Sequence, residues 1–181
     1  QQSGQPLKVI IGAGITQFDG WVATDIPAFD ILKHGHWAEL FQPNSIDRML
    51  AEHVFEHLTT DQFQDFLRIA RIYLSDDGRV RVAIPDGYHP DPDYINHVRP
   101  GGIGVGADDH KVLYTCDSMA DILSTQGYDY QFLECFDADG EFHRADWQAE
   151  DGFIQRSSQY DKRNANGKLA YTSLIVDFWV K

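Results

Sequence analysis

Residues 7–14 read LKVIIGAG and give the first indication of the fold of the chain. Residues 7–11 are mostly apolar and β-branched, which is typical of a buried strand. Gly12 and Gly14 follow at once, and glycine lets a backbone adopt unusual dihedral angles and approach a ligand closely. The stretch does not match the dinucleotide-binding fingerprint, because the third glycine of that motif would fall at Gln17. It predicts a strand that ends in a cofactor-binding turn, with an ordinary turn as the alternative.

Further predicted strands and helices alternate along the chain. Apolar or β-branched runs predict strands at 21–26, 46–51, 80–84, 128–135 and 169–178. Thr59 and Gln62 have the spacing of a capping box before an amphipathic helix, and a second helix is predicted at 118–126, with Gly127 as its stop. Residues 34–36 are assigned to a loop. Such alternation predicts one α/β domain over residues 1–181, a three-layer Rossmann-like arrangement with a mostly parallel sheet.

Composition excludes several classes of protein. The 181 residues include 28 acidic and 15 basic side chains, a formal net charge of −13, and the basic residues form no cluster. Nucleic acid is therefore not an expected partner. No apolar run approaches the roughly 20 residues that cross a bilayer, so no membrane partner is expected either. Cys116 and Cys135 are too few for a disulfide framework, and we expect a reducing, cytoplasmic location.

Asp25 follows the second predicted strand, 11 residues after Gly14. At this place in a nucleotide-binding fold, a carboxylate accepts hydrogen bonds from the two hydroxyl groups of a ribose. The alternative is a loop aspartate that caps the backbone from Ile26 onward. The pairing with the glycine turn favours the ribose contact.

Residues 52–57 read EHVFEH and contain H-x-x-E-H, a zinc-protease signature with histidines at positions 53 and 57. That signature needs a continuous helix and a third ligand. Here it begins directly after a predicted strand and ends within about one turn. We therefore expect no metal, and a zinc hydrolase is the least favoured alternative.

Five segments, in their order, resemble class I S-adenosylmethionine (SAM)-dependent methyltransferases, and within them a group of short bacterial predicted methyltransferases. They are GAG at 12–14, GWVATD at 20–25, ID at 46–47, EHVFEHL at 52–58 and DGRVRVAIPD at 77–86. EHVFEHL and RVAIPDG are specific to that group. Similar stretches at 100–102, 106–111 and 171–174 extend the resemblance over nearly the whole chain.

The resemblance implies SAM as cofactor, with its methionine end cradled by Gly12, Ala13 and Gly14 and its ribose held by Asp25. Glu52 and His53 would line the cofactor near its sulfonium. Adenine contacts would come from residues 30–32 or 37–40. The resemblance also implies a late antiparallel strand.

Two departures from the family's pattern concern the glycine turn. Ile10 stands where the family has an acidic residue, and residues 15–20 are too few for a helix in the first crossover. We therefore predict that this helix is reduced or absent.

Catalytic candidates follow the later predicted strands. Asp86, His89 and His110 are expected near the same edge of the sheet, where a histidine near neutrality could remove a proton from an acceptor. Structural hydrogen bonding is the alternative for Asp86 and His110. Residues 136–168 are polar and predict either a substrate lid or a surface insertion.

Together these features predict a SAM-dependent methyltransferase that acts on an oxygen or nitrogen atom of a small-molecule acceptor. A non-catalytic, SAM-binding regulatory protein is the main alternative.

Overall fold

The computed structural model describes residues 5–165 and 167–181. Its strands and helices are β1 (Lys8–Ile11), β2 (Trp21–Thr24), α1 (His34–Leu40), β3 (Ile46–Glu52), α2 (Thr60–Tyr73), β4 (Leu74–Pro85), α3 (Pro92–Val98), α4 (Cys116–Thr125), β5 (Tyr128–Phe136), β6 (Phe142–Arg144) and β7 (Ser173–Val180). Three short 3₁₀ turns are η1 (Phe55–His57), η2 (Ala107–Asp109) and η3 (Ala149–Asp151).

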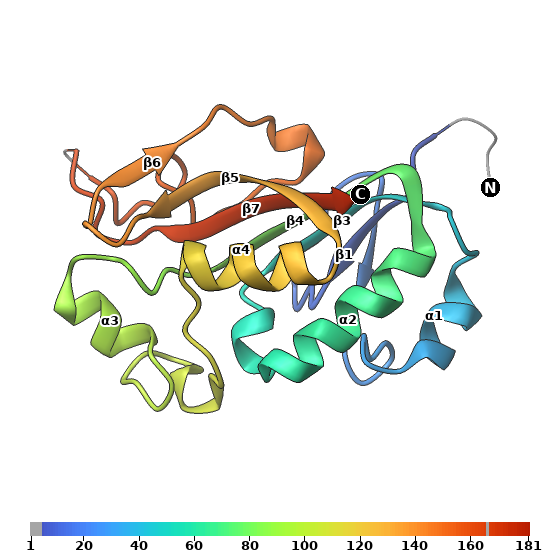
Figure 1. Ribbon diagram of the computed structural model, residues 1–181, viewed down its shortest axis with the longest axis horizontal. Coiled ribbons are helices and arrows are strands. Elements are labelled where there is room, and N and C mark those ends of the chain that lie inside the picture. The colour runs from blue at the N-terminus through green and yellow to red at the C-terminus, as the bar shows by residue number, and fades with distance from the viewer. Residues whose placement is uncertain (1–4, 166) are drawn as a thin grey trace.

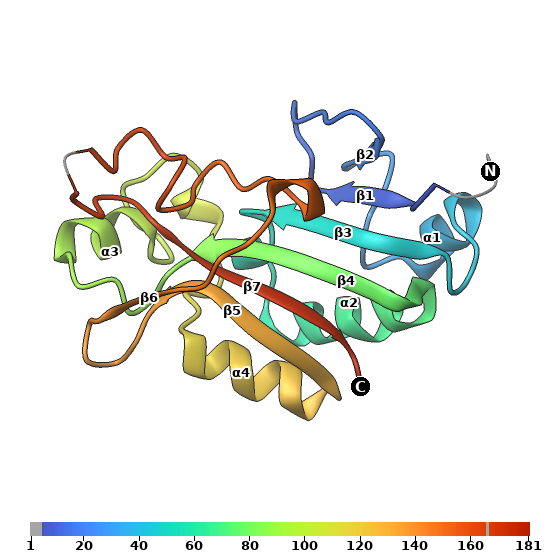
Figure 2. The same ribbon diagram turned by 90° about the horizontal axis from the view of Figure 1, so that it is seen from above.

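The strands form a single sheet in the order β2-β1-β3-β4-β7-β5-β6 (Figure 2). The pairs β1–β2, β1–β3 and β3–β4 are parallel, and β7 lies antiparallel between β4 and β5. The carboxyl ends of β1, β3 and β4 point the same way, toward the end of the molecule where α3 lies (Figure 2). The predicted α/β fold with a late antiparallel strand is confirmed.

The first crossover contains no helix, as predicted. Residues 12–20 connect the parallel strands β1 and β2 through bends and turns, which is shorter than the usual crossover. Gly12, Gly14 and Gly20 have φ values of 61°, 53° and 80°, a region that side chains with a Cβ rarely adopt. The backbone N–H of Ala13 donates to the carbonyl of Thr24 at 2.9 Å, which ties the turn to the end of β2.

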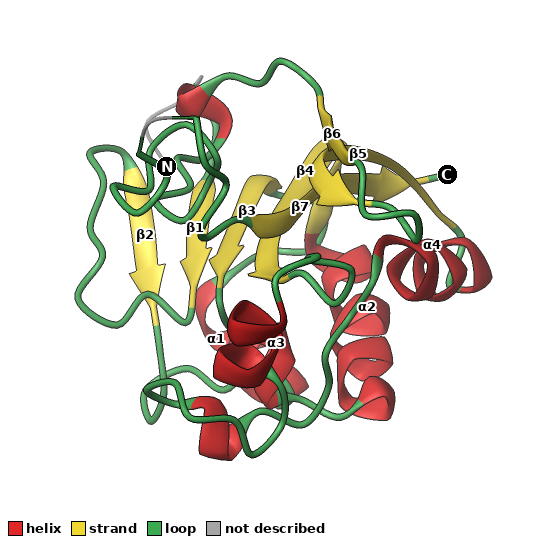
Figure 3. Ribbon diagram, turned by 90° about the vertical axis from the view of Figure 1, so that its left-hand side faces the viewer, coloured by secondary structure: helices red, strands yellow, loops and turns green. Residues whose placement is uncertain are grey.

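Helices α1, α2 and α4 cover one face of the sheet (Figures 1 and 3). Alternate residues of the strands point toward them, and on β4 these are Val80, Val82 and Ile84. The capping box is present at the start of α2, where Thr59 accepts from the N–H of Gln62 and the side chain of Gln62 accepts from the N–H of Thr59. The main apolar core therefore lies between this face and the helices.

The opposite face is covered by the chain between β5 and β7, drawn in orange in Figure 1. In its described residues, 137–165 and 167–172, the regular elements are β6 and η3. Ile154 packs there against a smaller apolar cluster that includes Leu50 and Ala83. Arg81 forms a buried bidentate pair with Asp177 at 2.7 and 2.8 Å and donates to two carbonyls of this segment. Most of residues 136–168, which were predicted to form a substrate lid or a surface insertion, thus belong to the third layer of the fold.

Two helices differ from the predictions. Residues 34–36 begin α1 instead of lying in a loop, because the fully buried Trp37 stacks on Tyr73 with 5.3 Å between ring centroids. The helix α3 was not predicted, although Asp91 caps it and proline occupies its first position.

No helix in the described residues is both long and apolar enough to span a bilayer.

Candidate functional site

The glycine turn after β1 is held close to the segment that follows β3. A Cβ built on Gly12 would lie 2.5 Å from Cγ2 of Val54, so no larger residue fits there without rearrangement. Gly14 has nothing within 4 Å of such a Cβ, but its N–H donates to Oδ2 of Asp25 at 2.7 Å. Glycine is therefore favoured at the two positions for different reasons, which are close packing at Gly12 and backbone conformation at Gly14.

Asp25 is partly exposed directly after β2. Its Oδ2 accepts from Gly14, and its Oδ1 accepts from the N–H of Ile26 at 2.8 Å. A carboxylate has about four acceptor sites, so two remain for a ligand. The loop-capping role and the ribose role are thus compatible, since the backbone donors fix the carboxylate that a ligand would meet.

A cavity of about 300 Å³ lies at the carboxyl ends of these strands, and we call it the strand-end cavity. Gly12 and Asp25 line it, together with apolar side chains from Ile26, Phe29, Ile31, Leu32, Val54 and Leu58. Residues 30–32 also line it, whereas Trp37 is fully buried and donates its indole N–H to Ile31. Of the two segments predicted near an adenine, 30–32 is the one that reaches this cavity.

His53 directly follows β3 and has a φ of 56°, which is uncommon for a residue with a side chain. Its Nδ1 lies 3.0 Å from Oε1 of Glu56, and its Nε2 lies 3.1 Å from Oγ of Ser173. The H-x-x-E-H segment does not form one continuous α-helix, because only residues 55–57 are helical and they form the 3₁₀ turn η1. Residues 53–57 therefore do not have the helical geometry of the zinc-protease signature.

Glu56 is 1% exposed, and among the described residues the close polar contact of its carboxylate is Nδ1 of His53, 3.0 Å from Oε1. Burial raises the pKa of its carboxyl group, but the charge and hydrogen bond of His53, the backbone N–H of Glu56 and the charge of His57 outweigh burial and leave the pKa below its usual value. No other residue's backbone N–H satisfies this carboxylate, which is rare for a buried side chain.

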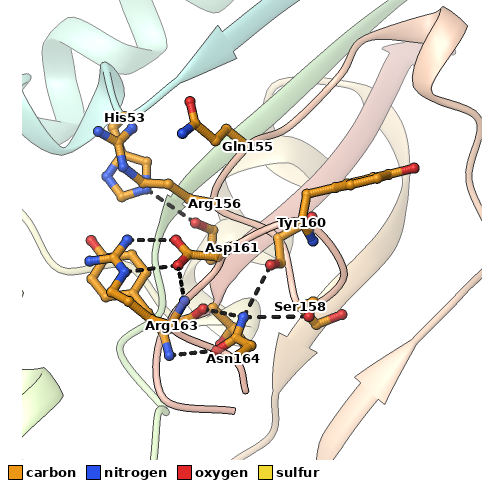
Figure 4. Close-up of polar contacts among 12 residues, drawn as sticks. His53, Gln155, Arg156, Ser158, Tyr160, Asp161, Arg163 and Asn164 are labelled. Atoms are coloured by element: carbon orange, nitrogen blue, oxygen red, sulfur yellow. Dashed lines mark hydrogen bonds and ion pairs between the residues drawn. The ribbon is translucent and has the colours of Figure 1, made fainter. Parts of the chain in front are cut away.

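A second cavity of about 170 Å³ adjoins the first, and we call it the histidine cavity. It is lined by His53, Glu56, His57, His97, His110 and Tyr171, among others, and it shares His53 and His57 with the strand-end cavity. From the segment 155–164, drawn in Figure 4, Arg156 also lines this cavity, and Arg163 lies over the ring of Tyr171 at 3.4 Å. The ring of Tyr171 in turn stacks beside His53. Ionisable side chains therefore surround a space that opens next to the strand-end cavity.

Two predicted catalytic residues lie elsewhere. Asp86 is buried, and its two oxygens accept from the backbone N–H groups of Tyr88 and Phe136. His89 stacks on Tyr94 and holds the carbonyl of Leu169 at 3.0 Å. Neither lines either cavity, so the structure does not bring these two residues to His110.

The other residues predicted to contact the cofactor also differ in whether they line a cavity. Glu52 points toward residues 155–156 and accepts their two backbone N–H groups at 3.2 and 2.8 Å, so its carboxylate does not line either cavity. Ala13 and Gly14 lie in the turn, but the cavity wall is formed by Gly12. The sequence singled out His57 only as part of the zinc-protease pattern, and Tyr171 only within the stretch 171–174 of the resemblance; neither was predicted to line a cavity.

No protein-family model matches the chain, and no curated protein matches it in sequence. Solved structures do resemble it. A SAM-dependent methyltransferase from Archaeoglobus fulgidus matches with a TM-score of 0.54 and 11% identity over 97% of this chain and 85% of that one. A SAM-dependent methyltransferase from Thermotoga maritima matches with a TM-score of 0.55 and 12% identity over 98% and 82%.

The CurJ carbon methyltransferase matches with a TM-score of 0.56 and 12% identity over the whole of this chain, which spans only 50% of that longer protein. Together with the strand order, these likenesses show that the chain has the fold of the class I SAM-dependent methyltransferases.

Proposed function

We propose that the chain binds SAM in the strand-end cavity and transfers its methyl group to an oxygen or nitrogen atom of a small-molecule acceptor. The observation that carries this proposal is the junction of Gly12 and Asp25 at one apolar cavity beyond the strand ends. Ligands of open α/β sheets bind at this place. Asp25 offers two free acceptor sites to a ribose, and Ile26, Phe29 and Leu32 offer apolar surface to an adenine ring.

When bound, SAM supplies a methyl group on a sulfonium, and transfer of that group leaves a neutral thioether. The residues of the chain mainly position the two reactants, which is where most of the rate enhancement of such a transfer arises. Of the three predicted catalytic residues, His110 is the one beside a cavity, where it could take the proton of the acceptor. Asp86 and His89 are better explained as parts of the architecture.

A non-catalytic SAM-binding protein is the second candidate, and the first crossover favours it. Without a helix there, no helix dipole faces the carboxylate of a bound SAM. Transfer of a labelled methyl group from SAM to any member of a panel of hydroxyl and amine acceptors separates an enzyme from a binding protein.

Calorimetric titration with SAM and with its demethylated product tests the binding step. The protein is first treated with a chelator, so that binding is measured without metal. A ligand at 100 times its dissociation constant stabilises the fold by about 2.7 kcal/mol, which a thermal melt detects. The absence of binding by both ligands at millimolar concentration would contradict the proposal.

Asp25→Ala tests the ribose contact. We expect SAM affinity to fall roughly 10- to 100-fold, because hydrogen bonds to a charged group are worth about 1.5–3 kcal/mol. The free energy of unfolding should fall less, by about 1 kcal/mol, through lost contacts to Gly14 and Ile26. Asp25→Asn should be intermediate.

Asp19→Ala is the matched control, because Asp19 is an exposed carboxylate in the same connection. It should leave both quantities unchanged. Equal SAM affinity in the wild type and in Asp25→Ala would move the ribose site elsewhere.

A further inference from the structure

A buried carboxylate and two imidazoles meet beside the histidine cavity. Ligand atoms of Glu56, His57 and His110 all lie within 4.8 Å of one another. Glu56 and His57 belong to η1, after β3, whereas His110 directly follows η2. The rings of His57 and His110 pack edge to face, with 4.8 Å between their centroids.

Glu56 is the buried acidic group of this cluster. Its Oε1 lies 3.0 Å from Nδ1 of His53, and no other described residue donates a hydrogen bond to either oxygen. Burial of an ionised carboxylate is costly unless a cation or several hydrogen bonds compensate it. The carboxylate therefore lies where a positively charged ligand would be stabilised.

The two imidazoles are oriented by contacts on their outer sides. Nδ1 of His110 lies 2.6 Å from the carbonyl oxygen of Val98, which can only accept, so Nδ1 carries a hydrogen and Nε2 is the nitrogen that faces away from this contact. Nδ1 of His57 lies 3.4 Å from Oδ2 of Asp109. Histidines that bind metals usually have such a carbonyl or carboxylate on their other nitrogen.

We infer that Glu56, His57 and His110 form a binding site for a first-row divalent transition ion such as Zn²⁺. Two imidazoles and one carboxylate are a donor set of metal sites that keep open coordination positions. Side-chain rotations would bring the ligand atoms to the roughly 2.0–2.2 Å that zinc requires. His53, at 3.0 Å from Glu56, would hold the carboxylate in place.

This inference reverses the expectation of no metal. That expectation considered only the sequence pair His53 and His57, which the structure does not place on one helix. The third ligand is instead His110, which the fold brings to Glu56 and His57 from a distant loop.

The position of the site indicates what the ion would do. It borders the histidine cavity, which adjoins the strand-end cavity through His53 and His57. Open coordination positions there would take an acceptor with a hydroxyl or amine group. With the ion bound, His110 would be a ligand and not the base, and the ion itself would make the acceptor easier to deprotonate. This role rests on the proposed function, whereas binding of the ion does not.

The test uses the full chain, stripped with a chelator and then dialysed against Zn²⁺ or Co²⁺. We expect about one ion per chain by elemental analysis, and a visible Co²⁺ spectrum typical of mixed nitrogen and oxygen ligands. Glu56→Gln and His110→Ala should each weaken binding at least roughly 100-fold, since each removes one of three protein ligands. If His110→Ala melts early, His110→Gln takes its place, because its amide can still donate to Val98.

His143→Ala is the matched control. Asp137, Glu141 and His143 also lie close enough to share an ion, but Nε2 of His143 already pairs with Asp137 at 2.6 Å and its side chain is exposed. This variant should bind the ion as the wild type does. Retention of far less than one ion by the wild type, or binding that survives in Glu56→Gln and His110→Gln, would overturn the site. Because SAM titration is done on stripped protein, that result would leave the proposed SAM binding standing.

Discussion

Two buried carboxylates at neighbouring strand ends have opposite surroundings. Glu56 follows β3 and Asp86 follows β4; they are 1% and 0% exposed, and each has a histidine three residues away. The oxygens of Asp86 accept from Tyr88 at 3.0 Å and from Phe136 at 2.7 Å. Glu56 accepts no hydrogen bond from the backbone of another described residue, and its close polar contact is Nδ1 of His53 at 3.0 Å. A buried carboxylate that the backbone satisfies is part of the architecture, whereas one left unsatisfied beside a cavity is available to a ligand.

The difference arises from what lies beyond each strand. The end of β4 is closed by the end of β5, whose Phe136 supplies a donor, and by Leu169, whose carbonyl holds His89. The end of β3 instead borders both cavities through His53 and His57. The pairs His53–Glu56 and Asp86–His89 look alike in the sequence, but different distant segments pack against them and give them different surroundings.

The largest expected effect is the loss of stability in Asp86→Ala. This change leaves the N–H groups of Tyr88 and Phe136 without acceptors, and each unsatisfied donor costs about 1–3 kcal/mol. We expect the free energy of unfolding, measured in urea, to fall by about 3–4 kcal/mol. SAM affinity should be unchanged when measured well below the melting temperature.

Glu56→Gln is the corresponding variant at the end of β3. Glutamine keeps the shape of the side chain and an acceptor oxygen for Nδ1 of His53 while it removes a buried charge, so the stability of the metal-free protein should change by less than about 1 kcal/mol. If Asp86→Ala is no less stable than Glu56→Gln, the distinction between the two strand ends fails.

The second effect is a pH dependence that belongs to Asp86. Burial raises the pKa of its carboxyl group from 3.8 to about 6, even though two backbone N–H groups lower it. The folded protein therefore binds this proton more tightly than the unfolded chain does. The resulting stabilisation is complete below pH 4 and is lost as the pH rises through about 6, by up to about 3 kcal/mol.

Urea unfolding at pH 4–7 in the wild type and in Asp86→Asn measures this contribution, because the amide does not titrate. The difference in unfolding free energy between the two proteins should shift across this range in favour of Asp86→Asn as the pH rises. A difference that stays constant with pH would show that Asp86 titrates alike in the folded and unfolded states.

The smallest expected effect compares two glycines of the turn beside β3. Both have positive φ, so alanine at either position costs about 1–2 kcal/mol of backbone strain. Gly12→Ala adds a clash with Val54, whereas Gly14→Ala meets nothing within 4 Å. We expect Gly12→Ala to be about 1–2 kcal/mol less stable than Gly14→Ala in urea unfolding, as an overpacked site would be.

Gly12→Ala should also weaken SAM binding more than Gly14→Ala does, because Gly12 forms the cavity wall. Equal stability and equal affinity in the two variants would mean that Val54 moves aside at no cost and that close packing at Gly12 is unimportant.

Elements whose signals are local could be predicted from the sequence. The apolar run before Gly12, the capping box of Thr59 and Gln62, and the stop at Gly127 each act within a few residues, and each element appears where it was predicted. The short first crossover was also predictable, since residues 12–20 leave no room for a helix. By contrast, α1 depends on burial of Trp37 against Tyr73, a contact that no local pattern encodes.

Only the tertiary structure decided which polar residues form a site. Asp86 and Glu56 both follow predicted strands and look alike in the sequence, yet only the first receives hydrogen bonds from β5 and from its own turn. His110 reaches Glu56 because η2 folds back over the end of β3, where Lys111 donates its N–H to the carbonyl of Glu56 at 2.7 Å. Secondary structure follows from interactions between near neighbours, but the satisfaction of a buried charge depends on whichever distant segment packs against it.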